Sequence, residues 1–258
     1  MSSSNMSYTP SELLAVLTAR MLEDGKTVFV GVGIPMISAS LAQKLHAPNI
    51  VIVFEGGIVA PQMKSHYLPL STNEVRAARR ALALPPINEI FFYQQRGYID
   101  YAIIGGAQVD KYGNVNTSVI GDHSNPRVRL PGSGGGNDIA STCTNVIIST
   151  LLEKRRFVER VDFITSPGYL EGYGSRERSG LIFGKPFKVV TDMCIMGFDD
   201  ETKTMKIEAL LQGVSLEQVF SNMGFKPLVA DDLKIIDPPT AEEIRLLREI
   251  DPEKLILK

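Results

Sequence analysis

A single acidic residue, Glu55, stands between a strongly apolar stretch and two glycines in the sequence VIVFEGGIVAP, residues 51–61. No lysine, arginine or histidine lies within eight residues of it on either side. A glutamate is ionised at neutral pH, and a carboxylate can attack an acyl carbon without a neighbouring base. The pattern therefore indicates a candidate nucleophile at the end of a buried strand. The simpler alternative, and the commoner outcome for any one strand-end acid, is a side chain that ends in water.

A second candidate is the glycine-rich stretch RLPGSGGGNDIAST, residues 129–142. Asn137 and Asp138 are suitable N-caps for a helix that begins here. Glycines before a helix leave backbone N–H groups uncovered, and such an array binds a phosphate or an oxyanion. The stretch lacks the Lys-Ser/Thr pair of a Walker A loop, and taken alone it is also compatible with a purely structural turn. The anion-binding residues that we predict are Gly132, Gly134, Gly135 and Gly136.

Together, the carboxylate and the loop fit acyl transfer through a mixed anhydride. Attack on an acyl carbonyl places negative charge on its oxygen, and backbone N–H groups stabilise that charge. His46, His66 and His123 are scattered and follow no metal-binding spacing, so no metal site is predicted. Cys143 and Cys194 stand alone, which fits a reducing compartment.

The elements that must position these residues alternate along the chain. Continuous apolar runs between helical patterns favour a parallel sheet with helices on both faces. We predict one α/β domain over residues 11–258, built on a single open, mostly parallel sheet, after a flexible tail over residues 1–10. The predicted helices cover residues 12–22, 35–45, 73–84, 215–224 and 240–250, with Ser11, Ser215 and Thr240 as N-caps of the first and the last two. The predicted strands cover residues 26–31, 49–54, 99–106, 114–121, 145–150, 161–165 and 187–192, with a hairpin over 196–210.

Several loops after predicted strands also carry small residues. In open parallel sheets, ligands bind outside the carboxyl ends of the strands, where glycines let a ligand approach the backbone. The candidate substrate-contacting residues at these ends are Gly31, Gly33, Gly105, Gly106 and Gln108. Glycines are also common in such loops for structural reasons alone.

Composition narrows the class of protein. The formal net charge is −2, which argues against a nucleic-acid or membrane-surface partner. The start, MSSSNMSYTP, has neither the basic region nor the apolar core of a signal peptide. No apolar run approaches the roughly 18 residues of a membrane helix. We therefore expect a soluble, cytoplasmic protein.

The chain resembles the B subunit of a family I CoA-transferase of the glutaconate CoA-transferase type, from about Ser11 to Leu257. The motifs that carry the resemblance are VGVGIP (30–35), FEGG (54–57), IGGAQVDKYGNVN (104–116), GSGGGNDIA (132–140), EKRRF (153–157) and TSPGYLEG (165–172). The resemblance implies that Glu55 is the nucleophile and that the glycine-rich segment, matched at Gly132, Gly134 and Gly135, borders the thioester. It also implies coenzyme A as a substrate, no permanently bound cofactor, and an A-type partner chain that completes the site.

One position departs from the family pattern, because many relatives carry Asn or Ser where this chain has Gly56. Retention of Glu55 favours CoA transfer over the acyl-CoA hydrolysis or decarboxylation of relatives that have lost the glutamate. A non-catalytic protein that binds CoA or the partner chain is the alternative from another class. Arg176 and Arg178 offer a cation for the far carboxylate of a dicarboxylic acyl group, although loop arginines are usually solvated.

Overall fold

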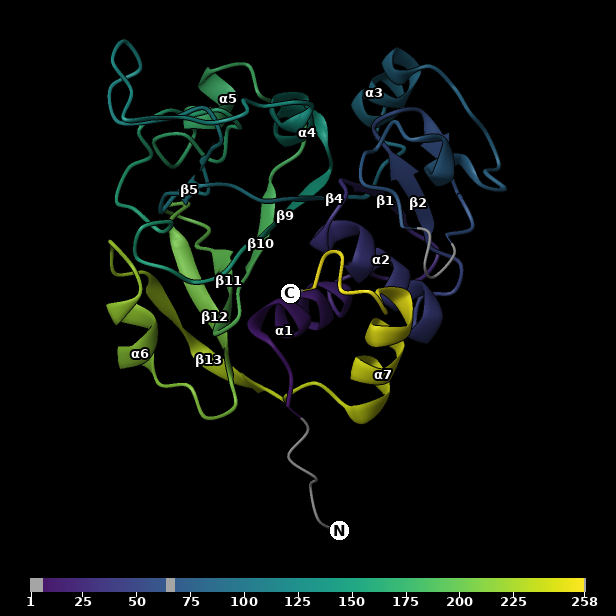
Figure 1. Cartoon of the computed structure of the whole chain (residues 1–258). Helices are drawn as coiled ribbons and strands as arrows, with labels where there is room; N and C mark the ends of the chain where they lie inside the picture. The colour runs from purple at the N-terminus through teal and green to yellow at the C-terminus, as the bar shows by residue number, and fades with distance from the viewer. Residues whose placement is uncertain (1–6, 64–67, 258) are drawn as a thin grey trace.

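A mixed sheet forms the centre of the molecule in the computed structural model, which describes residues 7–63 and 68–257 (Figure 1). Within these residues its nine strands follow the order β13-β12-β11-β10-β9-β4-β1-β2-β3. They are β1 Thr27–Val30, β2 Val51–Phe54, β3 Ile58–Val59, β4 Tyr101–Ile104, β9 Asn145–Ser149, β10 Pro186–Val190, β11 Cys194–Phe198, β12 Met205–Leu211 and β13 Leu228–Ile236. The run from β2 through β1, β4 and β9 to β10 is parallel throughout, so the prediction of a mostly parallel sheet is confirmed.

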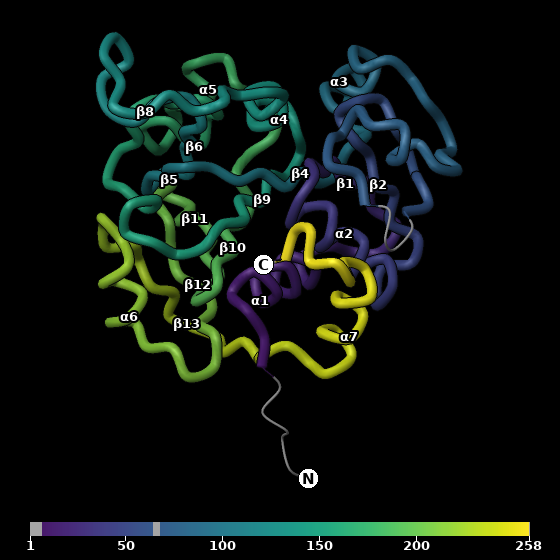
Figure 2. The backbone as a smooth tube through the Cα atoms, viewed as in Figure 1, coloured from purple at the N-terminus to yellow at the C-terminus, as the bar shows by residue number. Residues whose placement is uncertain are grey.

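Helices cover both faces of this sheet. They are α1 Pro10–Ala19, α2 Ile34–Leu45, α3 Ile87–Gln95, α4 Gly136–Thr142, α5 Ser175–Arg178, α6 Leu216–Ser221 and α7 Ala241–Ile250, with a 3₁₀ turn at Val75–Ala78. Two small antiparallel sheets pair β5 Gln108–Val109 with β6 Val115–Asn116, and β7 Val119–Ile120 with β8 Val128–Arg129. Figure 2 shows β5, β6, β8, α5 and α4 gathered at the same end of the sheet.

Side-chain alternation along the parallel strands divides the core into two layers. Val28 and Val30 of β1 join the apolar cluster under α1, α2 and α7. Phe29, between them, joins the cluster on the opposite face, which also contains Ile90 of α3 and Ile139 of α4. Successive residues of a strand point to opposite faces, so buried strands need apolar residues at every position. This explains why these strands are continuous apolar runs.

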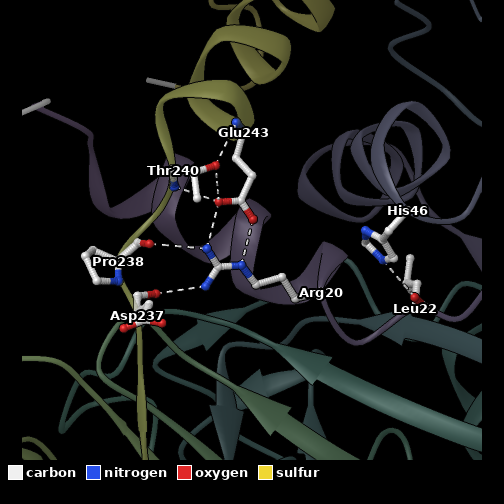
Figure 3. A network of polar contacts seen from close by, with 7 residues as sticks. All are labelled: Arg20, Leu22, His46, Asp237, Pro238, Thr240 and Glu243. Carbon is white, nitrogen blue, oxygen red and sulfur yellow. Dashed lines mark hydrogen bonds and ion pairs between the residues drawn. The ribbon is translucent and has the colours of Figure 1, made fainter.

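The helical layer of α1, α2 and α7 is joined by polar contacts between segments far apart in the sequence (Figure 3). Arg20, which follows α1, donates two hydrogen bonds of 2.7 Å to the carboxylate of Glu243 in α7. The same guanidinium reaches the carbonyl oxygens of Asp237 and Pro238. The ring of His46, at the end of α2, lies 2.9 Å from the carbonyl oxygen of Leu22. These contacts hold together the helical layer that packs on one face of the parallel strands.

Two predicted caps are confirmed and two are wrong. Ser215 and Thr240 each form a capping box, with Gln218 and Glu243 respectively. The first helix is capped by Thr9 rather than Ser11. The Thr9 hydroxyl accepts a hydrogen bond from the amide of Glu12, and the Glu12 carboxylate accepts one from the amide of Thr9. Thr9 and Pro10, which we assigned to the tail, therefore belong to this helix start, while residues 1–6 lie outside the described part.

The second wrong cap concerns α4. Gly135 occupies its N-cap position, so Asn137 and Asp138 lie within the first turn of the helix instead. His66, to which the sequence assigned no metal-binding role, lies outside the described residues.

Tertiary pairing overrides the predicted helix over residues 73–84. Only a 3₁₀ turn forms there, because the chain lies along β3 instead: Leu82 donates its amide to Val59, and Gln62 donates to Arg79. Arg80 has a φ of 51°, which a right-handed helix does not accommodate.

The predicted strands over residues 114–121 and 161–165 also differ from the structure. The first is split between β6 and β7 outside the main sheet, and the second contains no strand. Helix α3 and strand β13 were not predicted.

Candidate active site

A cavity of about 360 Å³ opens at the carboxyl ends of the parallel strands. Four neighbouring strands contribute: Gly31 follows β1, Glu55 follows β2, Gly105 follows β4 and Ser149 ends β9. The glycine-rich loop before α4 closes one wall. In the sheet, β2 lies on one side of β1 and β4 lies on the other. The cavity therefore lies at the point where the strand order reverses. Open parallel sheets bind ligands at such a switch point.

Glu55 directly follows β2, in the turn that leads to β3, and it faces the glycine-rich loop, where a Cβ on Gly135 would meet its carboxylate. Val53, two residues earlier on β2, belongs to the apolar cluster under α3 and α4. Glu55 is half-buried and lines the cavity. Within the described part of the chain, its carboxylate makes no hydrogen bond or ion pair. The carboxylate is therefore open to a reactant that enters the cavity.

The loop and the carboxylate meet at Gly135. A Cβ added to this glycine would lie 3.2 Å from both Cδ and Oε1 of Glu55, and 2.7 Å from Cζ of Phe91. The absence of a side chain therefore lets the loop backbone approach the carboxylate. Phe91, on α3, covers the same position from outside and packs against Phe29, with ring centroids 5.8 Å apart.

The four loop glycines differ in what their amides do. Gly132 donates its N–H to the carbonyl of Thr117, and Gly136 donates to the carbonyl of Ser133. The amides of Gly134 and Gly135 make no hydrogen bond among the described residues. All four glycines line the cavity, so two of the predicted anion donors are open and two hold the loop in shape.

The strand-end candidates divide in a similar way. Gly31 and Gly105 line the cavity, whereas Gly33 is the N-cap of α2 and is not among the lining residues. The carbonyl of Gly106 accepts a 3.1 Å hydrogen bond from Arg156, in the EKRRF motif. The structure therefore brings only part of this predicted set to the cavity.

Gln108 lies outside the cavity and is 6% exposed. Its side-chain oxygen accepts from Asn116 at 2.7 Å and from the amide of Asp162 at 3.0 Å, while its nitrogen donates to the Asp162 carboxylate. Both ends of the amide are thus used within the protein. Gln108 holds the 108–121 segment to the 162 region instead of facing the Glu55 site.

The position after Glu55 has no room for a side chain. A Cβ on Gly56 would lie 2.1 Å from Oδ1 of Asn73 and 2.5 Å from the carbonyl oxygen of Thr72. At Gly57, where φ is 92°, it would lie 1.9 Å from the carbonyl oxygen of Pro85. The side chain of Asn73 thus occupies the space that a side chain at position 56 would need. In this structure, therefore, the Asn or Ser of the family pattern would not fit at position 56 unless Asn73 moved.

A buried arginine supports the far end of α4. Arg176 is 2% exposed, and burial lowers the pKa of its guanidinium. Each of its nitrogens donates to backbone carbonyls, which belong to Ala140, Ser141, Pro167, Gly168, Phe183 and Gly184. Arg176 therefore has no donor left for a substrate carboxylate, and it is not solvated as loop arginines usually are, so neither alternative considered from the sequence holds for it. Arg178 remains exposed.

Hydroxyl groups in the cavity wall were missed by the sequence reasoning. Thr117, Ser133, Ser149 and Ser166 all line it. Ser149 shares a 2.8 Å hydrogen bond with Thr18 of α1. No spacing or periodicity marks these residues, and Ser166 carried only the weak signal of belonging to the TSPG motif.

Two further findings concern the described residues as a whole. They contain no group of three or more His, Cys, Asp or Glu side chains arranged to hold a metal ion. None of their helices is long and apolar enough to cross a membrane.

Known proteins resemble this chain over most of its length. Residues 12–222 match the model of the coenzyme A transferase family. The chain is 38% identical to the B subunit of 3-oxoadipate CoA-transferase from Pseudomonas knackmussii, over 95% of this chain and 94% of that protein. It is also 38% identical to the B subunit of glutaconate CoA-transferase from Acidaminococcus fermentans, over 97% of this chain and 96% of that protein.

Solved structures agree with the sequence matches. The crystal structure of the Acidaminococcus fermentans glutaconate coenzyme A-transferase matches with a TM-score of 0.90 and 36% identity, covering 98% of both chains. The decarboxylase AibA/AibB matches with a TM-score of 0.80 at 22% identity, covering 96% of this chain and 97% of that chain, which shows the shared fold alone. The chain therefore belongs to the coenzyme A transferase family and is a CoA-transferase subunit of the B type.

Proposed function

We propose that this chain transfers coenzyme A from an acyl-CoA to an acceptor carboxylate through a glutamyl-CoA thioester formed on Glu55. The observation that carries the proposal is the approach of the Gly135 backbone to the Glu55 carboxylate inside the cavity. It joins an unpaired nucleophile to open backbone N–H groups, which are the two parts that acyl transfer without a metal requires.

The proposed reaction has two exchanges. The carboxylate of Glu55 attacks the thioester carbonyl of the donor, the C–S bond breaks, and the CoA thiolate leaves a mixed anhydride. The thiolate then attacks the Glu55 carbonyl of that anhydride and releases the donor acid, so that CoA is held on Glu55. An acceptor carboxylate repeats these steps in reverse and leaves as the new acyl-CoA. Coenzyme A is the substrate, and the scheme uses no permanently bound cofactor.

The amides of Gly134 and Gly135 are the proposed oxyanion donors. They are the loop glycines whose N–H groups have no partner among the described residues, and Gly135 lies beside Glu55. Donors that are fixed before the reaction stabilise developing negative charge without a cost of reorganisation. Gly132 and Gly136 are proposed to hold the loop through their bonds to Thr117 and Ser133.

An A-type partner chain is proposed to complete the site. The side chains that line the cavity include Glu55 but no lysine, arginine or histidine, so this chain brings no cation there. Large apolar side chains are exposed on segments that adjoin the site: Ile87 and Phe92 on α3, and Ile182 and Phe183 after α5, are 46–71% exposed. Exposed apolar groups of this size are typical of surfaces that bind another protein.

The proposed acyl group carries a second carboxylate. Both relatives at 38% identity are named for dicarboxylic acids, 3-oxoadipate and glutaconate. The cavity of about 360 Å³ and its hydroxyl-lined wall suit a short acyl chain with further oxygen atoms.

The test is to trap the intermediate in the assembled complex with its A-type partner. Incubation with a dicarboxylic acyl-CoA in the absence of acceptor, followed by borohydride and peptide mapping, should locate a reduced residue at Glu55. Glu55→Ala should abolish both the label and turnover, while Glu171→Ala, an exposed glutamate outside the cavity, should change neither. A label on another residue, or turnover in Glu55→Ala, would contradict the mechanism.

The dependence on a partner has its own measurement. This chain, purified alone, should show no CoA transfer, and activity should appear when an A-type chain is added. Full activity in the isolated chain would contradict the shared site.

A further inference from the structure

Ser166 is held rigidly at the cavity wall by its backbone. Its amide donates to the carbonyl of Val115 and its carbonyl accepts from the amide of the same residue, so both main-chain groups are paired. The residue is 3% exposed and lines the same cavity as Glu55. The position of its side chain is therefore set by the 115–116 segment rather than by a mobile loop.

Nothing within the described chain bonds to the hydroxyl of Ser166, and this residue is more buried than Thr117 and Ser133, whose cavity hydroxyls are also unbonded. The neighbouring hydroxyl of Thr165 accepts the amide of Thr117 at 2.9 Å and shares a 2.7 Å hydrogen bond with Ser118. The cavity hydroxyl of Ser149 is bonded to Thr18. A nearly buried hydroxyl that opens only to a cavity takes its partner from whatever occupies that cavity.

The glycine-rich loop lies against both Ser166 and the carboxylate of Glu55. A Cβ on Gly135 would meet Glu55 at 3.2 Å, whereas a Cβ on Gly136 would lie 3.0 Å from Oγ of Ser166. Adjacent loop residues thus face these two groups, and both groups line one cavity. An acyl chain joined to Glu55 that continues along the loop reaches Ser166 with its later atoms, beyond the reacting carbonyl.

We propose that Ser166 is a specificity-determining residue, whose hydroxyl hydrogen-bonds an oxygen that the acyl group carries beyond its thioester carbonyl. This rests on the proposed function, since it assumes that the acyl group is joined to Glu55. The matching substrates are short acyl groups with a second carboxylate or a keto oxygen. A purely aliphatic acyl group of the same length displaces water from the hydroxyl and leaves it unpaired, which lowers affinity.

The experiment compares two donors that differ at one end. The assembled complex with its A-type partner is assayed with glutaryl-CoA and with pentanoyl-CoA, in which a methyl group replaces the far carboxylate, with acetate as the acceptor. A hydrogen bond to a charged group contributes a factor of roughly 10 to 100 in binding. Ser166→Ala should therefore lower the ratio of kcat/KM for glutaryl-CoA to that for pentanoyl-CoA by roughly 10-fold or more. Ser166→Thr, which keeps the hydroxyl, should retain most of the ratio.

The control is Ser141→Ala, a serine on α4 that does not line the cavity, and it should leave the ratio unchanged. An unchanged ratio in Ser166→Ala, or an equal loss of kcat with both donors, would overturn the specificity role. A wild-type complex that transfers CoA from neither donor, and carries no label on Glu55, would instead contradict the underlying function. The two failures are therefore distinguishable.

Discussion

Adding one methyl group at Gly135 tests the contact on which the proposed mechanism depends. Gly135 has φ −78° and ψ −1°, a conformation that alanine adopts without strain, so the substitution adds a methyl group and little else. The new Cβ would lie 3.2 Å from Cδ and Oε1 of Glu55. Restoring an ordinary contact requires the carboxylate or the loop to move by a few tenths of an ångström.

The expected cost follows from the geometry. A displacement of about 1 Å in a reacting group costs about 100-fold in rate, and loss of one oxyanion donor costs roughly 100- to 1,000-fold. Gly135→Ala keeps its N–H and moves the carboxylate by less than about 1 Å. We therefore expect kcat to fall roughly 10- to 100-fold, which is about 1.4 to 2.7 kcal/mol in the activation free energy.

The assay is steady-state CoA transfer in the assembled complex, together with thermal unfolding of each variant. The same Cβ would also lie 2.7 Å from Cζ of Phe91, so the ring must tilt. The double variant Gly135→Ala/Phe91→Leu removes that overlap and leaves the contact with Glu55, and its kcat should remain low relative to Phe91→Leu alone. Wild-type kcat in Gly135→Ala, with unchanged unfolding temperature, would refute the close approach of loop and carboxylate.

Three further predictions concern the surroundings of the site. Gly56→Ala should lower the free energy of unfolding by about 1–3 kcal/mol in a denaturant titration, since its Cβ overlaps Asn73, and Asn73→Gly in the same chain should recover part of the loss. Arg176→Met should lower the free energy of unfolding by at least about 3 kcal/mol, because several buried carbonyl groups lose their hydrogen-bond donor. Wild-type stability in this variant would show that water replaces the guanidinium. A hydrogen bond from Arg248 lowers the pKa of Glu12, so the stability that this pair contributes is present above pH 4.5 and is lost as the pH falls through the lower folded-state pKa. Arg248→Met should reduce the acid dependence of the unfolding free energy below pH 4.5, and an identical pH profile would contradict this role.

Local signals in the sequence determined a large part of the fold. Continuous apolar runs predicted the parallel strands, because a strand covered on both faces cannot carry polar residues at alternate positions. Ser215 and Thr240 identified two helix starts, since a capping box is complete within four residues. The strand-end position of Glu55, and each of the motifs that together carry the family resemblance, also came from residues close together in the sequence.

Only the tertiary structure decided which segments meet. Residues 73–84 have a helical pattern, yet the amide of Leu82 donates to Val59 and the carbonyls of Arg79 and Ala83 accept from Gln62 and Val59, a pairing that no local pattern specifies. Strand β13 was missed because its sequence, LVADDLKII, mixes charged and apolar residues, as suits a strand at the edge of a sheet.

The same limit applies to the site. The contact of Gly135 with Glu55, the space that Asn73 takes beside Gly56, and the open hydroxyl of Ser166 each join residues from separate loops. The sequence supplied the proposed nucleophile, Glu55, and the candidate loop glycines because their chemistry is local to each residue. Their mutual distances, and which loop amides remain free to bind an anion, depend on how the carboxyl ends of β1, β2, β4 and β9 converge in the folded chain.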